Sequence, residues 1–98
     1  MKRAEVIAKL KTIEPQLRAH GIGALYLFGS HARDEAHEDS DVDVFVDPAS
    51  DDFYDLEHFI GAHEALERAC GHRVDYGTRK GLVKFYRPAI ESEAIRIF

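Results

Sequence analysis

The sequence predicts a small α/β domain in which a short sheet packs against helices. Two observations support this class. The apolar runs 25–28 and 42–46 have strand character, and apolar residues at three- and four-residue steps indicate helices around them. Ninety-eight residues allow one domain, spanning 1–98, with a modest two-layer core. Alternation of helix and strand is typical of a small α/β sandwich.

The first 21 residues are predicted to be helical. Apolar residues at steps of four, three and four form one stripe: Val6, Leu10, Ile13 and Leu17. Pro15 is expected to kink this segment or restart it as a second short helix, with Thr12 available as a cap. Gly21 is expected to end the helix, and Gly23 to lie in the loop before the first strand.

Two strands with a short helix between them are predicted in the middle of the chain. The first strand covers 25–28, the helix runs from 30 to about 37, and the second strand covers 42–46 and ends before Pro48. The residues of the second strand alternate between polar and apolar, which is typical of a strand buried on one face.

A longer helix, a third strand and two shorter elements follow. The long helix is predicted from about 53 to 69, with one stripe of side chains: Leu56, Phe59, Ile60, His63, Leu66 and Cys70. The third strand is the β-prone segment 73–76. A further helix is predicted over 78–86, with a last short turn after Pro88. The ending, 94–98, fits either a fourth strand or the end of a helix.

Composition and charge limit the classes of function. A net charge of -5 argues against a stable nucleic-acid binder, although a metal ion can still bring an anionic ligand to an acidic site. No apolar run approaches the ~20 residues of a membrane span, and no signal peptide opens the chain. The single cysteine, Cys70, suits a reducing cytoplasm, where we expect the protein to act.

Two carboxylates at the second strand form the first half of a candidate site. Asp41 and Asp43 are two residues apart, so a strand points both side chains to the face opposite Val42 and Val44. Their Cα atoms then lie roughly 6.5–7 Å apart, close enough for both carboxylates to bind one divalent cation. Magnesium is the expected ion because it prefers hard oxygen ligands together with substrate phosphates.

A Gly-Ser turn forms the second half. Gly29 lets the backbone approach a ligand closely, and Ser30 begins a helix whose free N–H groups favour phosphate. Arg33 can reach the same phosphate or pair with a nearby acid. We expect Ser40 either to bind the nucleotide or to be a turn residue before the second strand. A phosphate-binding turn opposite a pair of metal-binding carboxylates suits phosphoryl or nucleotidyl transfer.

A third acid, Asp75, lies in the third predicted strand, where aspartate is unusual. If this strand neighbours the second, Asp75 lies beside Asp41 and Asp43 as a general base or a further metal ligand. Carboxylates ~4 Å apart repel by about 4 kcal/mol at an effective dielectric near 20. We therefore expect the three acids to titrate together and to cost stability that bound magnesium restores.

The spacing of these residues resembles a known family. Gly29-Ser30, ten residues and then Asp41-Val42-Asp43 follow the pattern G-S-x10-D-x-D of the nucleotidyltransferase superfamily typified by DNA polymerase beta. The strings F-G-S-x-A-R and S-D-x-D, and the ending I-x-x-E-A-I, are similar to its minimal nucleotidyltransferase (MNT) branch. The resemblance covers nearly the whole chain and places Asp75 at the third acid. One departure is Asp34, where relatives often carry glycine.

This resemblance implies a nucleotidyltransferase fold, a small mixed sheet packed against helices. Members of the family use two magnesium ions to transfer a nucleoside monophosphate from a nucleoside triphosphate to a hydroxyl. The implied catalytic and metal-binding residues are Asp41, Asp43 and Asp75, and the implied nucleotide-binding residues are Gly29, Ser30, Arg33 and Ser40. Small members resemble antitoxins that add AMP to a HEPN-domain ribonuclease toxin, or that block it by binding.

Three functions are therefore open. The first is magnesium-dependent transfer of AMP from ATP to a partner protein, with the chain as antitoxin of a HEPN toxin. The second is a binding module that neutralises its partner without catalysis. The third is transfer to a small molecule, which we disfavour because no acceptor-binding domain is expected in 98 residues. A homo- or hetero-oligomer is compatible with each.

Aromatic residues are numerous for so small a domain, with Phe53, Tyr54, Phe59 and Phe85 among them. We expect the apolar stripe on the long helix to be core, the usual outcome for such a pattern, rather than a partner surface. The six histidines lack zinc-site spacing, and we expect them in solvent or at the edge of the core.

Overall fold

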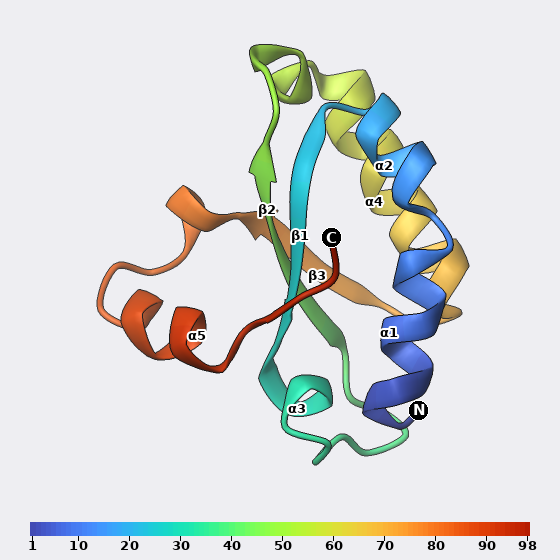
Figure 1. Ribbon diagram of the computed structural model, residues 1–98, viewed down its shortest axis with the longest axis vertical. Helices are drawn as coiled ribbons and strands as arrows, with labels where there is room; N and C mark the ends of the chain where they lie inside the picture. The colour runs from blue at the N-terminus through green and yellow to red at the C-terminus, as the bar shows by residue number, and fades with distance from the viewer.

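A four-stranded mixed sheet organises the chain, and the computed structural model describes all 98 residues (Figure 1). The strands are β1 (Ile22–Phe28), β2 (Val42–Pro48), β3 (Val74–Thr78) and β4 (Ile95–Arg96), in the spatial order β3-β2-β1-β4. β1 is antiparallel to both β2 and β4, whereas β2 and β3 are parallel. The predicted class, a small mixed sheet packed against helices, is confirmed.

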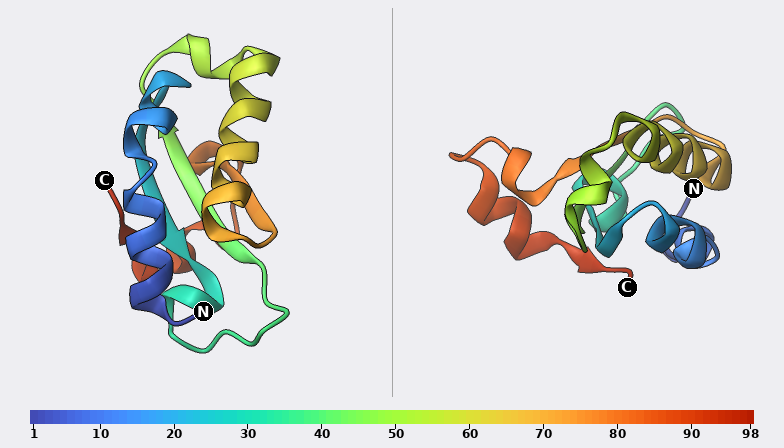
Figure 2. Two further views of the ribbon diagram at one scale, coloured as in Figure 1. Left: turned by 90° about the vertical axis from the view of Figure 1, so that its right-hand side faces the viewer. Right: turned by 90° about the horizontal axis from the view of Figure 1, so that it is seen from above.

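Around this sheet the chain forms five helices. They are α1 (Arg3–Lys11), α2 (Glu14–Ala19), α3 (Gly29–Ala32), α4 (Leu56–Cys70) and α5 (Arg87–Glu93), with the 3-10 turns η1 (Asp51–Tyr54) and η2 (Arg79–Gly81). α1, α2 and α4 lie side by side against the sheet, and α3 lies at the end of β1 (Figures 1 and 2). The segment 79–94, with η2 and α5, lies on the other side. None of the helices is both long and apolar enough to cross a membrane.

The core lies between the sheet and the three covering helices. The predicted stripe on α1 and α2 is buried in it: Val6, Leu10, Ile13 and Leu17. Val42, Val44 and Val46 of β2 face the same core, and each buried side chain of this size stabilises the fold by about 1.5–3 kcal/mol. The alternation along β2 therefore leaves its polar side chains on the face that carries segment 79–94.

The two N-terminal helices are separate. Pro15 lies in the first turn of α2, where its missing N–H costs nothing, so the restart alternative is the observed one. Thr12 does not cap α2, because its hydroxyl donates instead to the Lys9 carbonyl at 2.6 Å. Gly21 follows α2 with φ +89°, as expected of a helix stop. The first strand begins earlier than predicted, at Ile22, because an irregularity in the β1–β2 register accommodates Gly23 within the strand.

The helix predicted over 30–37 is wrong beyond Ala32. α3 is a single turn, and Asp34 then adopts a left-handed conformation with φ +60°, which an α-helix cannot contain. The helix predicted over 78–86 is also wrong. The Thr78 hydroxyl does cap a helical turn, accepting from Gly81 N–H at 3.0 Å, but that 3-10 turn ends at Gly81. A real helix, α5, follows from Arg87, and the ending forms strand β4.

Burial on α4 differs from the prediction. The buried residues of this helix are Ala62, Ala65, Leu66 and Cys70. Leu56 and Ile60, in contrast, are 71% and 45% exposed, so the stripe is not all core. Phe53, the first aromatic residue of this stretch, is fully buried as expected, but it belongs to η1, and its ring packs against Phe59 and Tyr76. Exposed aromatic and aliphatic side chains also occur in the 82–86 loop, including Phe85 at 84%.

Candidate active site

The parallel pairing of β2 with β3 brings two of the predicted acids side by side. Asp43 and Asp75 are direct register partners, so their side chains project from the same face of neighbouring strands roughly 4.8 Å apart. Asp41 precedes β2 by one residue and shares the side of Asp43. The condition on which the third acid depended, that strand three neighbours strand two, is therefore met.

The Gly-Ser turn begins directly beside these acids. Phe28, the last residue of β1, pairs with Asp43, so Gly29 is the first residue past the strand at that point. Gly29 has φ +76°, and a Cβ built there would lie 2.3 Å from Oδ2 of Asp43. Glycine is thus required twice, for the backbone conformation and for the space that the carboxylate occupies.

Crowding of the acids changes the protonation of Asp43. Partial burial and the negative charges of Asp75 and Asp41 raise the pKa of Asp43 from 3.8 to about 6, while Arg33 acts in the opposite direction. A carboxylate whose pKa is raised first by burial and then by neighbouring acids is favoured by a nearby positive charge.

Asp43→Asn should stabilise the fold at neutral pH. Because the pKa of Asp43 is raised on folding, the folded protein binds more protons than the unfolded chain between about pH 3.8 and 6. The cost of the carboxylate is therefore absent below pH 3.8 and complete above pH 6. We expect Asp43→Asn to raise the free energy of unfolding by about 1–2 kcal/mol at pH 7.5, after allowing for solvent screening, and to have little effect at pH 4.

Urea unfolding at the two pH values measures this difference. Asp39→Asn, in the exposed loop before β2, serves as the matched control because it removes the same charge away from the acids. An equal gain for Asp43→Asn at pH 4 and pH 7.5 would contradict the electrostatic cause.

Arg33 and Ser40 have other partners in the structure. The Arg33 guanidinium donates to Glu93 (Nη1 to Oε2, 2.9 Å) and to Glu35 (Nε to Oε2, 3.2 Å), and both raise its pKa. The Ser40 hydroxyl accepts from the His37 N–H at 2.9 Å, the bond of a turn residue. These are the ion-pair and turn alternatives given above, and the nucleotide contacts of both residues stay predictions.

The departure at Asp34 has a structural explanation. Asp34 is the only residue other than glycine with positive φ, so its backbone keeps the conformation that glycine would adopt. Aspartate tolerates this region better than most residues, and its Oδ1 accepts from the N–H of Arg3 at 2.9 Å. The loop therefore follows a glycine-type path, and its side chain ties the loop to the start of α1.

His31 is a polar residue of this region that the sequence analysis placed wrongly. It is 1% exposed, and its Nδ1 has no hydrogen-bond partner. Burial lowers the pKa of His31, opposed by a contact between its ring and the backbone of Asp41. Because α3 is one turn long, His31 and Ala32 face inward while Arg33 faces solvent, a pattern that the short polar string did not indicate.

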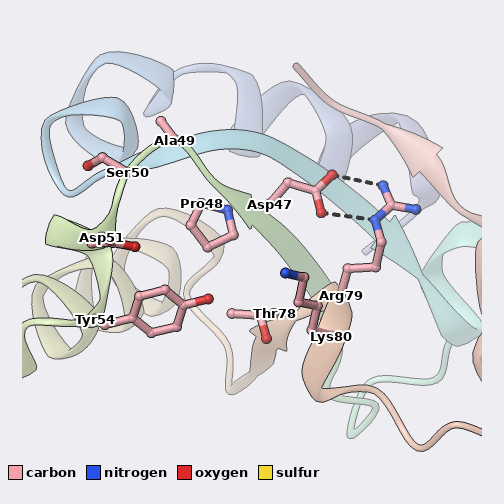
Figure 3. Close-up of a pocket in the computed structure, with 9 residues that line it drawn as sticks. All are labelled: Asp47, Pro48, Ala49, Ser50, Asp51, Tyr54, Thr78, Arg79 and Lys80. Carbon is pink, nitrogen blue, oxygen red and sulfur yellow. Dashed lines mark hydrogen bonds and ion pairs between the residues drawn. The ribbon is translucent and has the colours of Figure 1, made fainter.

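Arg79 is a second residue that the sequence analysis missed. It donates to both carboxylate oxygens of Asp47, at 2.9 and 2.8 Å (Figure 3). It also donates to Glu91, and its guanidinium lies over the rings of Tyr26 and Phe45. The bond to Arg79 lowers the pKa of Asp47. Asp47 is therefore held in a close ion pair, whereas Asp41 has only a long ion pair with Arg73, at 4.0 Å, and Asp43 has none.

Three hollows border β2 and β3. One, of about 440 Å³, is lined by Asp41, His63, Glu67, Arg73, Val74 and Asp75. A smaller one, of about 210 Å³, lies on the other side of Asp75 beside Phe28 and Tyr76. The third, of about 420 Å³, lies around Asp47 and Arg79 at the far end of β2, roughly 20 Å along the strand from Asp41 (Figure 3). The two hollows that share Asp75 are the ones that adjoin the acids.

The acids fit a magnesium ion that is shared with a substrate. No three His, Cys, Asp or Glu side chains are arranged around one point as a complete metal cage. Magnesium is usually held by one or two carboxylates with substrate phosphates and water, so such a cage is not required. The register pairing places Asp43 beside Asp75, and a divalent cation there would offset both the burial of Asp43 and the repulsion between the acids.

A Gly-Ser turn facing paired acids on a mixed sheet defines a nucleotidyltransferase. The model of the nucleotidyltransferase domain family matches residues 6–97, nearly the whole chain. The chain therefore belongs to the nucleotidyltransferase family, as its spacing predicted.

Known proteins with similar sequence or structure agree with this membership. The protein adenylyltransferase MntA of Thermococcus cleftensis is 40% identical over 81 residues, which cover 74% of this chain and 80% of the relative. A solved structure, named provisionally as a minimal nucleotidyltransferase, is 33% identical, with a TM-score of 0.81 over 97% of this chain and 95% of its own. A toxin–antitoxin structure with AMP-PNP shares the fold, with a TM-score of 0.70 at 22% identity over 92% of this chain and 72% of its own.

Proposed function

We propose that the protein transfers AMP from ATP to a hydroxyl of a partner protein, in a reaction that depends on magnesium. The observation that carries this proposal is the alignment of Asp43 with Asp75 beside the Gly29 turn. The three carboxylates and the N–H groups of the turn lie together at one end of the sheet, which supports a shared role in binding a cation and a phosphate. The relative named as a protein adenylyltransferase supports a protein as acceptor.

The residues divide the reaction between them. Asp41 and Asp43 would hold magnesium, which when bound neutralises the phosphates and polarises the α-phosphorus. The Gly29-Ser30 turn would bind the triphosphate through its N–H groups. Asp75 would accept the proton of the acceptor hydroxyl, whose oxygen bonds to the α-phosphorus as the bond to pyrophosphate breaks.

We further propose that the partner is a HEPN-type toxin and that the two proteins act in the cytoplasm. One structure with this fold is described as a toxin–antitoxin complex, and the acceptor of a protein adenylyltransferase is by definition another protein. The single buried cysteine, Cys70, suits a reducing compartment in which ATP is abundant.

Mass spectrometry of the partner tests the proposal. The product of the adjacent gene is incubated with this protein, magnesium and ATP, and its intact mass is compared with that of a sample in which EDTA removes the metal. We expect the mass to rise by one or more AMP units only with magnesium present. An unchanged mass under both conditions, with the two proteins shown to form a complex, would overturn the enzymatic proposal in favour of inhibition by binding alone.

A further inference from the structure

A carboxylate of the last helix lies at the mouth of the Gly-Ser turn. Glu93, in the final turn of α5, accepts from the Gly29 N–H through Oε1 (3.3 Å) and from Arg33 through Oε2 (2.9 Å). The two donors come from opposite ends of α3, and Glu93 joins them from 60 or more residues away. One side chain therefore uses both donors.

These donors are the ones that an anionic ligand would use at this turn. A backbone N–H past a strand and a guanidinium one turn later are typical partners of a phosphate oxygen. A carboxylate offers two anionic oxygens of similar hydrogen-bonding capacity. Glu93 thus satisfies Gly29 and Arg33 as a phosphate would, and both groups cannot occupy them at once.

The charge of Glu93 also reaches the acids. It is among the groups that raise the pKa of Asp43, although its contribution is smaller than that of Asp75 or Asp41. A triphosphate that enters the turn would therefore meet an additional negative charge as well as occupied donors.

The helix that carries Glu93 is held mainly by polar contacts. None of the seven residues of α5 is buried. The ion pair Arg33–Glu93 joins the helix to the turn, and the ion pair Arg79–Glu91 joins it to Arg79, which is paired with Asp47 of β2. Arg87 also donates to the Arg79 carbonyl. Partly exposed ion pairs of this kind each contribute at most about 1 kcal/mol, so α5 can leave the turn at small cost.

We propose that Glu93 competes with the nucleoside triphosphate for the Gly29 N–H and the Arg33 guanidinium. It occupies Gly29 and Arg33 in the free protein, and the entering triphosphate displaces it, so that nucleotide binding is coupled to the position of α5. This inference rests on the proposed function, because it assumes that the turn binds the triphosphate. It gives Arg33 two successive partners, a carboxylate before binding and a phosphate after it.

Isothermal titration with magnesium and ATP tests the competition in the full chain. Glu93→Gln keeps the shape and an acceptor for the Gly29 N–H but removes the charge. We expect it to bind ATP roughly three- to tenfold more tightly than wild type, with the gain shrinking as salt is added. Glu35→Gln is the matched control, since Glu35 also pairs with Arg33 but does not contact Gly29. We expect a smaller gain from it.

A purely structural role for Glu93 predicts no gain in ATP affinity for the Glu93→Gln variant. If Glu93 only braced the turn, Glu93→Gln would bind ATP equally well or more weakly, and either result would overturn the inference. The test is separate from that of the proposed function. Tighter ATP binding without any transfer to a protein would support the competition while the adenylyltransferase proposal failed.

Discussion

Replacing both Asp41 and Asp43 with asparagine is expected to abolish AMP transfer, lowering its rate by on the order of a thousandfold or more. Asparagine keeps the shape of aspartate but is a neutral and much weaker ligand for magnesium. The rate of mass gain of the partner protein measures the loss. Because mutual repulsion with Asp75 is relieved, the double variant should also melt higher than wild type, so inactivity cannot be attributed to unfolding.

Asp51→Asn with Asp52→Asn is the matched control for this variant. It removes the same two charges from exposed positions of η1, at the far end of β2 from the acids. Transfer at the wild-type rate by the Asp41/Asp43 variant would show that the assignment of catalysis to these two residues is wrong. Loss of transfer with continued inhibition of the partner protein would show that binding alone inhibits it.

Gly29→Ala is expected to destabilise the fold and to disturb the acids at the same time. Its Cβ would lie 2.3 Å from Oδ2 of Asp43, at a φ of +76° that alanine disfavours. Strain and overpacking together should cost roughly 2–4 kcal/mol of the free energy of unfolding. Asp43 would also be pushed from its position, so AMP transfer should fall with the stability. Urea unfolding and the transfer rate measure the two effects.

Two other glycines separate the causes. Gly71 also has positive φ, +63°, but nothing lies within 4 Å of its Cβ position, so Gly71→Ala isolates the backbone strain at about 1 kcal/mol. Gly77 has neither feature, so Gly77→Ala should leave stability nearly unchanged. A cost at Gly29 no greater than that at Gly71 would rule out the clash with Asp43.

The acidic half of the site could be predicted because its geometry is local. Two residues separate Asp41 from Asp43, and the period of a strand then decides that their side chains share a face. The neighbouring position of Asp75 needed only the assumption that β2 and β3 pair, which short βαβ connections favour. The Gly21 stop and the break at Pro15 were predictable for the same reason, since each depends on a few adjacent residues.

The side-chain contacts between distant parts of the chain could not be predicted from local patterns. Arg79 meets Asp47 across 32 residues, and Glu93 meets Gly29 across 64. No periodicity in either segment indicates such a pairing. The 78–86 helix failed for a related reason: the Thr78 cap is real, but a cap cannot show how far the helix continues past a glycine.

The exposed end of α4 shows a different limit. Helical spacing identified the side of α4 on which Leu56 and Ile60 lie, but not how far the sheet extends beneath it. Phe53, from the preceding 3-10 turn, is fully buried where the first turns of the helix were expected to pack. Spacing alone identifies a stripe, and its burial depends on what the rest of the chain places opposite.

The order of strands has a mechanical consequence for the connection 79–94. It leaves β3 at one edge of the sheet and enters β4 at the other edge. The connection therefore crosses the face of the sheet and is joined to it at both edge strands. The pairing of β4 with β1 is short. Ile95 and Arg96 pair with β1, and two further backbone hydrogen bonds join residues 97–98 to Leu25. A force applied to α5 would therefore act first on the pairing between β4 and β1. If it opened, β1 would present an unpaired edge on which a strand of another chain could add.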